Sequence, residues 1–106
     1  MNIKLLRFKS VKSTNDVALK LIQKKNTRST IIVSEMQTHG RGTRGKKWIS
    51  QKGNLFISIF FEMNQKNIDF KHFAILNAYL LKNIFTNHLS KKIKIKWPND
   101  LLYDDK

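Results

Sequence analysis

The stretch 30–47, TIIVSEMQTHGRGTRGKK, joins a β-branched run to a loop rich in glycine and positive charge. The run 30–35 carries Thr, Ile, Ile and Val in succession, which predicts a strand. Three glycines fall within Gly40–Gly45, and because glycine favours neither helix nor strand, we expect this segment to be a loop. Four cations lie in or beside it: Arg41, Arg44, Lys46 and Lys47. Unhindered backbone N–H groups beside cations are the components of a phosphate or carboxylate site.

The same loop nearly matches the P-loop pattern of Gly, four residues, Gly, Lys and then Ser or Thr. Lys47 stands where the pattern needs a Mg²⁺-binding hydroxyl, and 48–53 is a poor start for a helix. We therefore reject a P-loop. Taken by itself, the loop is open to two interpretations, an anion site or a solvated basic hairpin loop.

Outward toward the N-terminus, the sequence predicts a strand and a helix. Residues 5–11 alternate loosely between apolar and polar, as a strand does. Ser13 is a helix-capping residue type, and Asp16 follows three positions later, an arrangement similar to a capping box. An apolar stripe at helical spacing follows: Val17, Ala18, Leu21 and Ile22. The helix is expected to fray at 24–26.

Toward the C-terminus, the pattern predicts two strands and a long helix. Residues 55–62 are nearly continuously apolar, which is typical of a strand buried on both faces. Apolar residues recur at helical spacing over 70–88, which predicts an amphipathic helix. Lysines alternate with Ile93, Ile95 and Trp97, which predicts a strand with one basic face, and Pro98 ends it.

The last residues predict a hairpin of which only one arm is present. Residues 101–103 begin a strand, and Asp104-Asp105 has the composition of a hairpin turn. The sequence ends at Lys106, which leaves a strand edge unpaired, a liability that complete domains usually cover. We therefore expect a C-terminally truncated chain that self-associates through the exposed strand edge.

Composition restricts the class of protein. The chain has 106 residues, 41% of them hydrophobic, no cysteine and a net charge of +14. That is one domain at most, able to bury a core, and it excludes disulfide scaffolds, cysteine zinc sites and thiol catalysis. The three histidines have no metal-ligand spacing, and neither a membrane span nor a signal peptide is evident, so we expect a cytoplasmic protein.

The charge by itself does not identify a partner. A strongly basic domain is drawn to nucleic acid, acidic proteins and nucleotide phosphates alike. Most of the 21 basic residues are lysines spread over the whole chain, and Asn and Ile are also abundant. Drift in composition from an AT-rich coding sequence therefore explains the charge as well as a selected binding face does.

Several short motifs occur in a fixed order along the chain. They are Ser13-Thr14-Asn15, Gln37 with Gly40-Arg41-Gly42, Trp48 with Ser50 and Gly53-Asn54-Leu55, and Lys96-Trp97-Pro98-Asn99-Asp100. Together they resemble the catalytic domain of biotin protein ligases, which make biotinyl-5'-AMP from biotin and ATP and transfer biotin to a lysine of a biotin carboxyl carrier protein. The resemblance runs from about Leu5 to Lys106. Lipoate ligases share the fold but are not known for the Gly-Arg-Gly loop followed by Lys-Trp-Pro-Asn-Asp, so they rank below.

The resemblance implies an α+β fold of the kind shared with class II aminoacyl-tRNA synthetases. Residues 1–106 would form the N-terminal half of that catalytic domain, with a sheet packed on two helices. No winged-helix segment precedes Leu5, so we expect no DNA-binding domain.

The resemblance also assigns roles to particular residues. Biotin and its adenylate would contact Ser13, Thr14, Asn15, Gln37, Arg41, Gly42 and Thr43. ATP would contact Arg44, Trp48, Lys96 and Asn99, and Arg41, Lys96 and Asp100 would be catalytic. Mg²⁺ is expected on the phosphates, with no protein residue assigned as its ligand. Plainer interpretations remain open: Ser13 also serves as a helix cap, Gln37 suits an ordinary loop, Trp48 suits a core, and Trp97 and Pro98 suit a structural role.

Two departures from the family pattern bear on activity. Thr43 stands where the family commonly has a basic residue that helps to retain the adenylate, although Arg44 is next to it. The family also continues past the last hairpin with a lysine at the turn, which by register is the residue after Lys106 or Lys106 itself. We therefore expect the second half of the active site to lie outside this chain.

Two other functions remain as alternatives. One is a basic nucleic-acid-binding module, in which Lys92, Lys94, Lys96 and the glycine loop meet phosphates while Trp48 or Phe60 stacks on bases. Its affinity would fall steeply with salt and would not respond to biotin. The other is the inert product of an interrupted gene.

Overall fold

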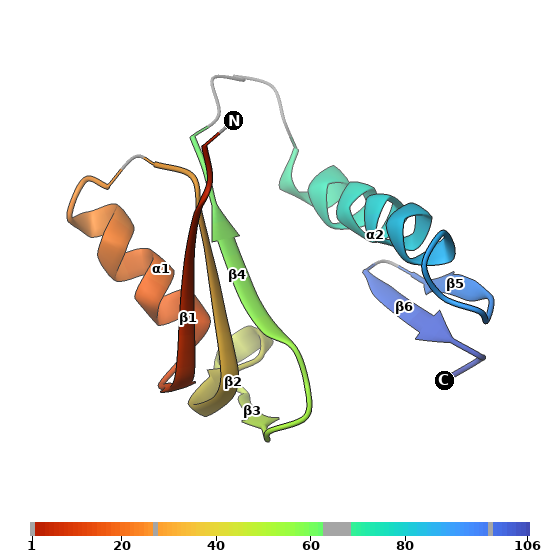
Figure 1. Cartoon of the computed structure of the whole chain (residues 1–106), viewed down its shortest axis with the longest axis horizontal. Coiled ribbons are helices and arrows are strands. Elements are labelled where there is room, and N and C mark those ends of the chain that lie inside the picture. The colour runs from red at the N-terminus through yellow and green to blue at the C-terminus, as the bar shows by residue number, and fades with distance from the viewer. Residues whose placement is uncertain (1, 27, 63–68, 98) are drawn as a thin grey trace. The chain divides into compact units, whose positions relative to one another are not determined.

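The computed structural model describes residues 2–26, 28–62, 69–97 and 99–106, with backbone alone for 70 and 71. The chain forms two compact units, Met1–Met63 and Asn64–Lys106 (Figure 1). Each unit has a β-sheet and an α-helix of its own. The sequence predicts one sheet on two helices, whereas the described chain has a four-stranded and a two-stranded sheet, because the last two strands pair with each other.

The first unit is a mixed sheet with one helix. Its elements are β1 (Lys4–Val11), α1 (Thr14–Gln23), β2 (Thr30–Arg41), a 3-10 turn (Thr43–Gly45), β3 (Lys47–Ser50) and β4 (Phe56–Phe60). β1 runs parallel to β2 with α1 as the crossover, while β3 and β4 run antiparallel to β2. β4 pairs with the first residues of β2, and β3 pairs with the last residues of β2. β2 is therefore the strand that organises the unit. The strands and the helix predicted for this half are confirmed.

α1 begins at a polar cap and packs on the sheet. The Ser13 Oγ accepts a hydrogen bond of 3.4 Å from the Asp16 N–H, so the predicted cap is confirmed. α1 contacts β2 and β4 and buries Ala18, whereas Ile22, also assigned to the apolar stripe, is exposed at the last turn. The cap holds the first turn of α1, with Thr14 buried, beside the end of the sheet.

β2 is longer than the sequence predicts. Gly40 and Arg41 belong to the strand and pair with Trp48 and Lys47 of β3, so the expectation that all of Gly40–Gly45 is loop is wrong for these two residues. A Cβ on Gly40 would lie 2.7 Å from the Trp48 carbonyl oxygen and closer still to the Ser50 hydroxyl. Gly40 therefore serves the close approach of β2 and β3, where no side chain fits, and not a turn.

The two faces of the sheet differ in burial. Ile32 and Ser58 lie opposite each other in the register of β2 and β4, and both are buried on the face that α1 covers. On the other face Ile57 is 44% exposed and Ile59 is 56% exposed. The strand predicted at 55–62 is confirmed, but its burial on both faces is wrong within the described first unit, because α1 covers one face alone.

The second unit is a helix with a β-hairpin. α2 (Phe70–Thr86) contacts both β5 (Ile93–Lys96) and β6 (Asp100–Tyr103), which are antiparallel. These three elements confirm the sequence prediction, and the predicted strand end at Pro98 lies outside the described residues. In the part of the chain that the structure describes, no helix has both the length and the apolar character needed to cross a bilayer.

The chain reverses again after β6, as predicted. Asp104 and Asp105 have positive φ angles of 55° and 62°, a left-handed conformation that Asp tolerates better than most residues. Tyr103 and Lys106 exchange backbone hydrogen bonds of 3.0 and 3.2 Å across the turn. This is the geometry of a two-residue hairpin turn.

Candidate functional site

A polar pocket of about 230 Å³ opens in the first unit where α1 begins. Its lining comes from the start of α1, from β2 and β3, and from the beginning of β4: Ser13, Thr14, Asn15, Gln37, Arg41, Trp48, Leu55, Phe56, Ile57 and Ser58. It thus brings together six of the residues predicted to bind substrate, from segments that are distant in the sequence. The crossover connection explains this, because it places the first turn of α1 beside the last half of β2.

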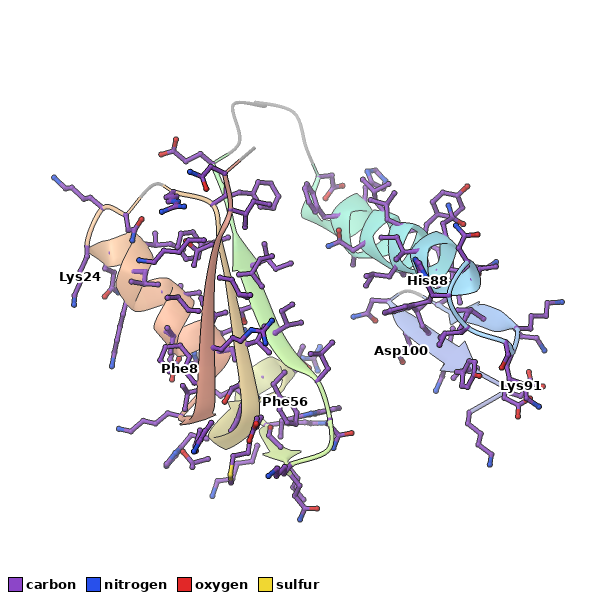
Figure 2. The ribbon with its side chains drawn as sticks, in the orientation of Figure 1. Phe8, Lys24, Phe56, His88, Lys91 and Asp100 are labelled. Atoms are coloured by element: carbon purple, nitrogen blue, oxygen red, sulfur yellow. The ribbon has the colours of Figure 1, made fainter. Side chains whose placement is uncertain are left out.

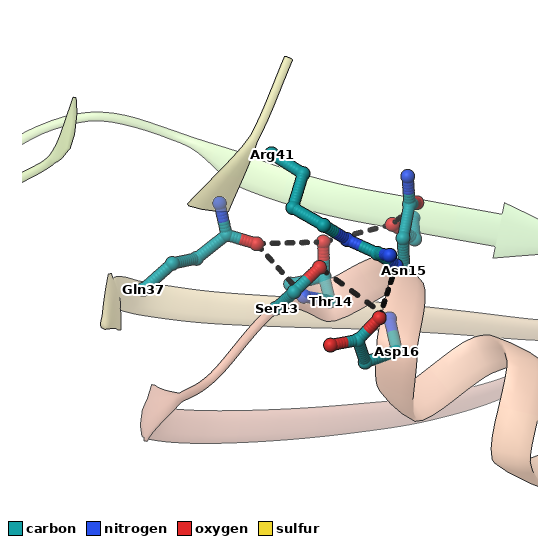
Figure 3. Close-up of polar contacts among 7 residues, drawn as sticks. Ser13, Thr14, Asn15, Asp16, Gln37 and Arg41 are labelled. Atoms are coloured by element: carbon teal, nitrogen blue, oxygen red, sulfur yellow. Dashed lines mark hydrogen bonds and ion pairs between the residues drawn. The ribbon is translucent and has the colours of Figure 1, made fainter. Parts of the chain in front are cut away.

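Thr14 and Gln37 connect α1 to β2 in the lining of the pocket. The Gln37 Oε1 accepts hydrogen bonds from the Thr14 backbone N–H at 2.7 Å and from the Thr14 hydroxyl at 3.2 Å (Figure 3). The Gln37 Nε2 donates to the Ser50 Oγ of β3 at 3.0 Å. Since both ends of the amide are engaged, Gln37 has a fixed orientation and is not an ordinary loop residue.

Asn15 is held by β4. The Ser58 Oγ donates to the Asn15 Oδ1 at 2.5 Å and lies 2.8 Å from the Thr14 Oγ1. No hydrogen bond within the described residues uses the Asn15 Nδ2. Because the oxygen of this exposed side chain is engaged, the amide presents an N–H donor to whatever enters the pocket.

Arg41 connects the pocket lining to the first turn of α1. It extends from the end of β2, and its Nη2 pairs with the Asp16 Oδ1 in the first turn of α1 (Figure 3). The side chains of Arg41 and Asp16 are 55% and 37% exposed. A guanidinium that is this accessible and has five donors can still bind an anion.

A second, larger cavity of about 580 Å³ adjoins the pocket. It shares Gln37, Arg41 and Trp48 with the pocket and adds Asp16 and two cations from the β2–β3 connection, Lys46 and Lys47. Trp48 is 63% exposed, so it is not a core residue. An accessible aromatic ring among three cations suits a ligand with both a flat ring and negative charge.

Gly42, Thr43 and Arg44 lie outside the lining of both cavities, whereas Gly45 lines the larger one. The Gly42 N–H donates to the Lys46 carbonyl at 2.6 Å and the Lys46 N–H donates to the Thr43 carbonyl at 3.2 Å, which closes the tight turn. Arg44 has a φ of 57° in this turn. The substrate contacts predicted for Gly42, Thr43 and Arg44 stay predictions.

Three predicted site residues belong to the second unit. Lys96 ends β5, Asp100 begins β6 and pairs with Lys96 in the register, and Asn99 lies between them. All three are exposed. Figure 2 shows Asp100 at one end of this hairpin and Lys91 at the other. Their predicted role at the phosphates stays a prediction.

Lysines of the second unit pair with both carboxylates of the acidic turn that follows β6. The Lys94 Nζ donates to the Asp105 Oδ1 at 2.6 Å, and Lys91 lies 3.7 Å from the Asp104 carboxylate. The hydrogen bond from Lys94 and its positive charge lower the pKa of the Asp105 carboxyl from its ordinary value. Among the residues described, no cluster of three or more His, Cys, Asp or Glu could hold a metal ion.

Three residues of the site were missed from the sequence. Ser58 interrupts an apolar strand, and a hydroxyl at such a position needs a partner, which was a usable signal. Asp16 was assigned to the helix cap, and Ser50 was quoted as part of a motif without a role. Their contacts with Arg41 and Gln37 join distant segments, which no local pattern predicts.

Comparison with known proteins gives the family. The biotin/lipoate A/B protein ligase family matches residues 7–106. The bifunctional ligase/repressor BirA of Escherichia coli (strain K12) is 32% identical over 75 residues, which cover 70% of this chain and 23% of BirA.

Solved structures agree with this match. The biotin acetyl coenzyme A carboxylase synthetase of Helicobacter pylori with bound biotinylated ATP has a TM-score of 0.82 and 26% identity, covering 98% of this chain and 51% of that one. The biotin protein ligase of Aquifex aeolicus in complex with biotin and ATP has a TM-score of 0.78 and 29% identity, covering 97% and 43%. The chain therefore spans about half the length of these structures or less, and the expected α+β catalytic-domain fold is confirmed. The chain belongs to the biotin/lipoate A/B protein ligase family, and within it the chain resembles the biotin protein ligases.

Proposed function

We propose that this chain is part of a ligase that joins biotin to AMP and transfers biotin to a lysine of a biotin carboxyl carrier protein. The observation that carries the proposal is the polar pocket, where Thr14, Asn15 and Gln37 are fixed by hydrogen bonds beneath Arg41. The ligands bound in the similar Helicobacter pylori and Aquifex aeolicus structures, biotinylated ATP and biotin with ATP, support it.

The bicyclic end of biotin fits the pocket at the start of α1. Its ureido group has a carbonyl acceptor and two N–H donors, so it needs fixed partners of both kinds. Asn15 offers an N–H donor, and the Ser13 and Thr14 hydroxyls and the Gln37 amide line the same pocket. Because these groups are already held by Ser58 and Ser50, little ordering remains to be done when the ligand binds.

The carboxylate of biotin would then lie toward Arg41 and the larger cavity. In the first step, a carboxylate oxygen attacks the α-phosphorus of ATP, the bond to the pyrophosphate oxygen breaks, and biotinyl-5'-AMP and pyrophosphate form. Both reacting groups are anionic, so their approach requires nearby positive charge. Arg41, Lys46 and Lys47 supply it in the described cavity, and Trp48 offers its ring to the adenine.

Lys96, Asn99 and Asp100 are proposed for the phosphate end. Mg²⁺ is usually held by one or two carboxylates together with substrate phosphates, and it keeps several waters. Asp100, exposed at the start of β6, fits as such a single ligand, and the lack of a multi-residue cluster among the described residues is compatible with this mode. When bound, Mg²⁺ would neutralise charge on the pyrophosphate leaving group.

The tight turn Thr43–Gly45 is proposed to close over the adenylate. The mixed anhydride is reactive and must be kept from water until it meets the carrier. Thr43 offers a hydroxyl where a basic residue would offer charge, so Arg44 carries more of the task of retaining the adenylate. In the second step, the neutral amine of the carrier lysine attacks the anhydride carbonyl, AMP leaves, and the amide bond forms with loss of a proton.

We expect the complete reaction to need residues that this chain does not contain. The matched structures are about twice as long as this chain, which supports the proposal. The 106-residue chain should therefore show no biotin-dependent exchange of pyrophosphate into ATP, while addition of the segments that complete the length of the matched structures should restore it. Exchange by the 106 residues alone would contradict this division.

Calorimetry with biotin tests the pocket itself. Weak binding is expected, reduced about three- to tenfold by Asn15→Ala and about tenfold or more by Arg41→Ala, the values for a lost neutral and a lost charged hydrogen bond. Asn83→Ala and Arg28→Ala make the same changes at exposed positions away from the pocket and should have no effect. Equal biotin binding by all five proteins would contradict the proposal, and binding of nucleic acid with no response to biotin would favour the alternative module.

A further inference from the structure

The proposed reaction assigns no role to the Asp16 carboxylate, which forms an ion pair with Arg41. Ser13 already caps α1 through the Asp16 backbone N–H, so the Asp16 carboxylate is not needed for the cap. That carboxylate is directed instead to Arg41, at the end of β2 and 25 residues away in sequence (Figure 3). The pair therefore joins α1 and β2 in the lining of the larger cavity, at the cation that also lines the small pocket.

Arg41 has a special position among the cations of the site. It lines both the small polar pocket and the larger cavity, whereas Lys46 and Lys47 line the larger one alone. Arg41 is thus the one of these three cations that an anionic group in either space can contact. In this structure the partner of Arg41 is a carboxylate of the protein itself.

We propose that Asp16 is a positioning residue for Arg41 and an internal competitor for it. It holds the guanidinium until a carboxylate or phosphate of the ligand replaces it, and so it weakens the binding of anionic ligands relative to neutral ones. This inference rests on the proposed function, because it takes the ligand to be biotin or its adenylate.

The competition follows from charge balance at the Arg41 guanidinium. An anion that binds Arg41 must either displace the Asp16 carboxylate or lie close to it, and both cost free energy that a neutral ligand does not lose. Both side chains are partly exposed, so solvent screens the effect and the pair has the strength of a surface ion pair. The corresponding change in affinity is about two- to fivefold.

The test compares an anionic and a neutral ligand that share the same ring system. Biotin and biotinamide are titrated by calorimetry at low salt into the wild type, into Asp16→Asn and into Glu35→Gln. Glu35→Gln also removes one negative charge from the first unit, and Glu35 lies on β2, the strand that carries Arg41. Glu35 pairs with Lys52 and lies outside both cavities. It therefore controls for net charge.

The expected result is that Asp16→Asn binds biotin about two- to fivefold more tightly than the wild type does, while biotinamide binds all three proteins equally. The gain should shrink as salt is raised. An unchanged or weaker affinity of Asp16→Asn for biotin, with biotinamide unaffected, would overturn the role of Asp16 and leave the proposed function in place. Loss of both ligands by Asp16→Asn would make Asp16 merely structural. Failure of the wild type to bind either ligand would overturn the proposed function and this inference with it.

Discussion

The Ser58 hydroxyl on β4 lies 2.5 Å from the Asn15 amide oxygen at the start of α1. Ser58 is buried and Asn15 is exposed, so the bond ties an accessible polar group to the interior of the sheet. It determines which end of the Asn15 amide faces the pocket. The proposed recognition of a carbonyl acceptor depends on this relationship.

Ser58→Ala should therefore weaken both the fold and the binding of biotin. The substitution removes the hydrogen bond to Asn15 and the contact with Thr14, with an expected loss of about 1 kcal/mol in the free energy of unfolding. The Asn15 amide becomes free to rotate, and affinity for biotin should fall by about the same free energy again. Urea unfolding and calorimetry measure the two quantities. Ser10→Ala, at an exposed position of β1, should change neither.

Gly40→Ala should destabilise the first unit, whereas Gly42→Ala should not. A Cβ at Gly40 collides with the Trp48 carbonyl at 2.7 Å, and the backbone there cannot move without separating β2 from β3. A Cβ at Gly42 meets Lys46 at an ordinary 3.5 Å. We expect a loss of about 1–3 kcal/mol for Gly40→Ala, measured by denaturant unfolding. Equal stabilities of the two variants would show that the strands do not approach this closely.

The hairpin turn should show a pH response that depends on Lys94. Lys94 lowers the pKa of the Asp105 carboxyl, so the ion pair stabilises the folded hairpin at pH values above the ordinary pKa of an aspartate, about 3.9. This stabilisation is lost as the pH falls through the lowered pKa. Lys94→Gln removes the hydrogen bond and the charge, so the pKa of Asp105 should rise. Titration of the carboxyl carbons by NMR measures it. A curve for Asp105 that is the same in both proteins would contradict the pairing.

The open face of the sheet should make the isolated chain self-associate. Ile57 and Ile59 are exposed beside a groove of about 490 Å³ lined by Leu5 and Val33 among others, and a net charge of +14 opposes association. Higher salt should increase association because screening weakens the repulsion but not the apolar attraction. Sedimentation at low and high salt tests this. The double variant Ile57→Thr and Ile59→Thr should stay monomeric at both, and a monomeric wild type at high salt would contradict the prediction.

Local patterns predicted most of the secondary structure. The β-branched run of β2, the Ser13 cap and the Asp104-Asp105 turn each depend on the conformational preferences of adjacent residues, and a sequence displays these directly. Gly40 was assigned to a loop because composition does not distinguish a glycine needed for a turn from one needed where two strands approach closely. The burial of Ile57 and Ile59 was wrong because an apolar strand does not reveal which of its faces a helix covers.

The site was predicted in part, and by resemblance. The motifs identified Thr14, Asn15 and Gln37, and the structure brings them into one pocket. The side chains that hold the site residues lie on other elements of the unit: Ser58 holds Asn15, Ser50 holds Gln37, and Asp16 holds Arg41. Such contacts depend on the register of the strands and on the crossover helix, which sequence reasoning did not determine.

An NMR titration of the isotopically labelled chain with biotin tests most directly whether the pocket at the start of α1 binds biotin. We expect saturable shifts of the Asn15 side-chain NH₂ and of the Thr14 and Gln37 amides, while the side-chain NH₂ of Asn83 on α2 does not move. Unchanged Asn15 and Thr14 signals at saturating biotin, or biotin-dependent shifts confined to residues outside this pocket, would contradict this expectation.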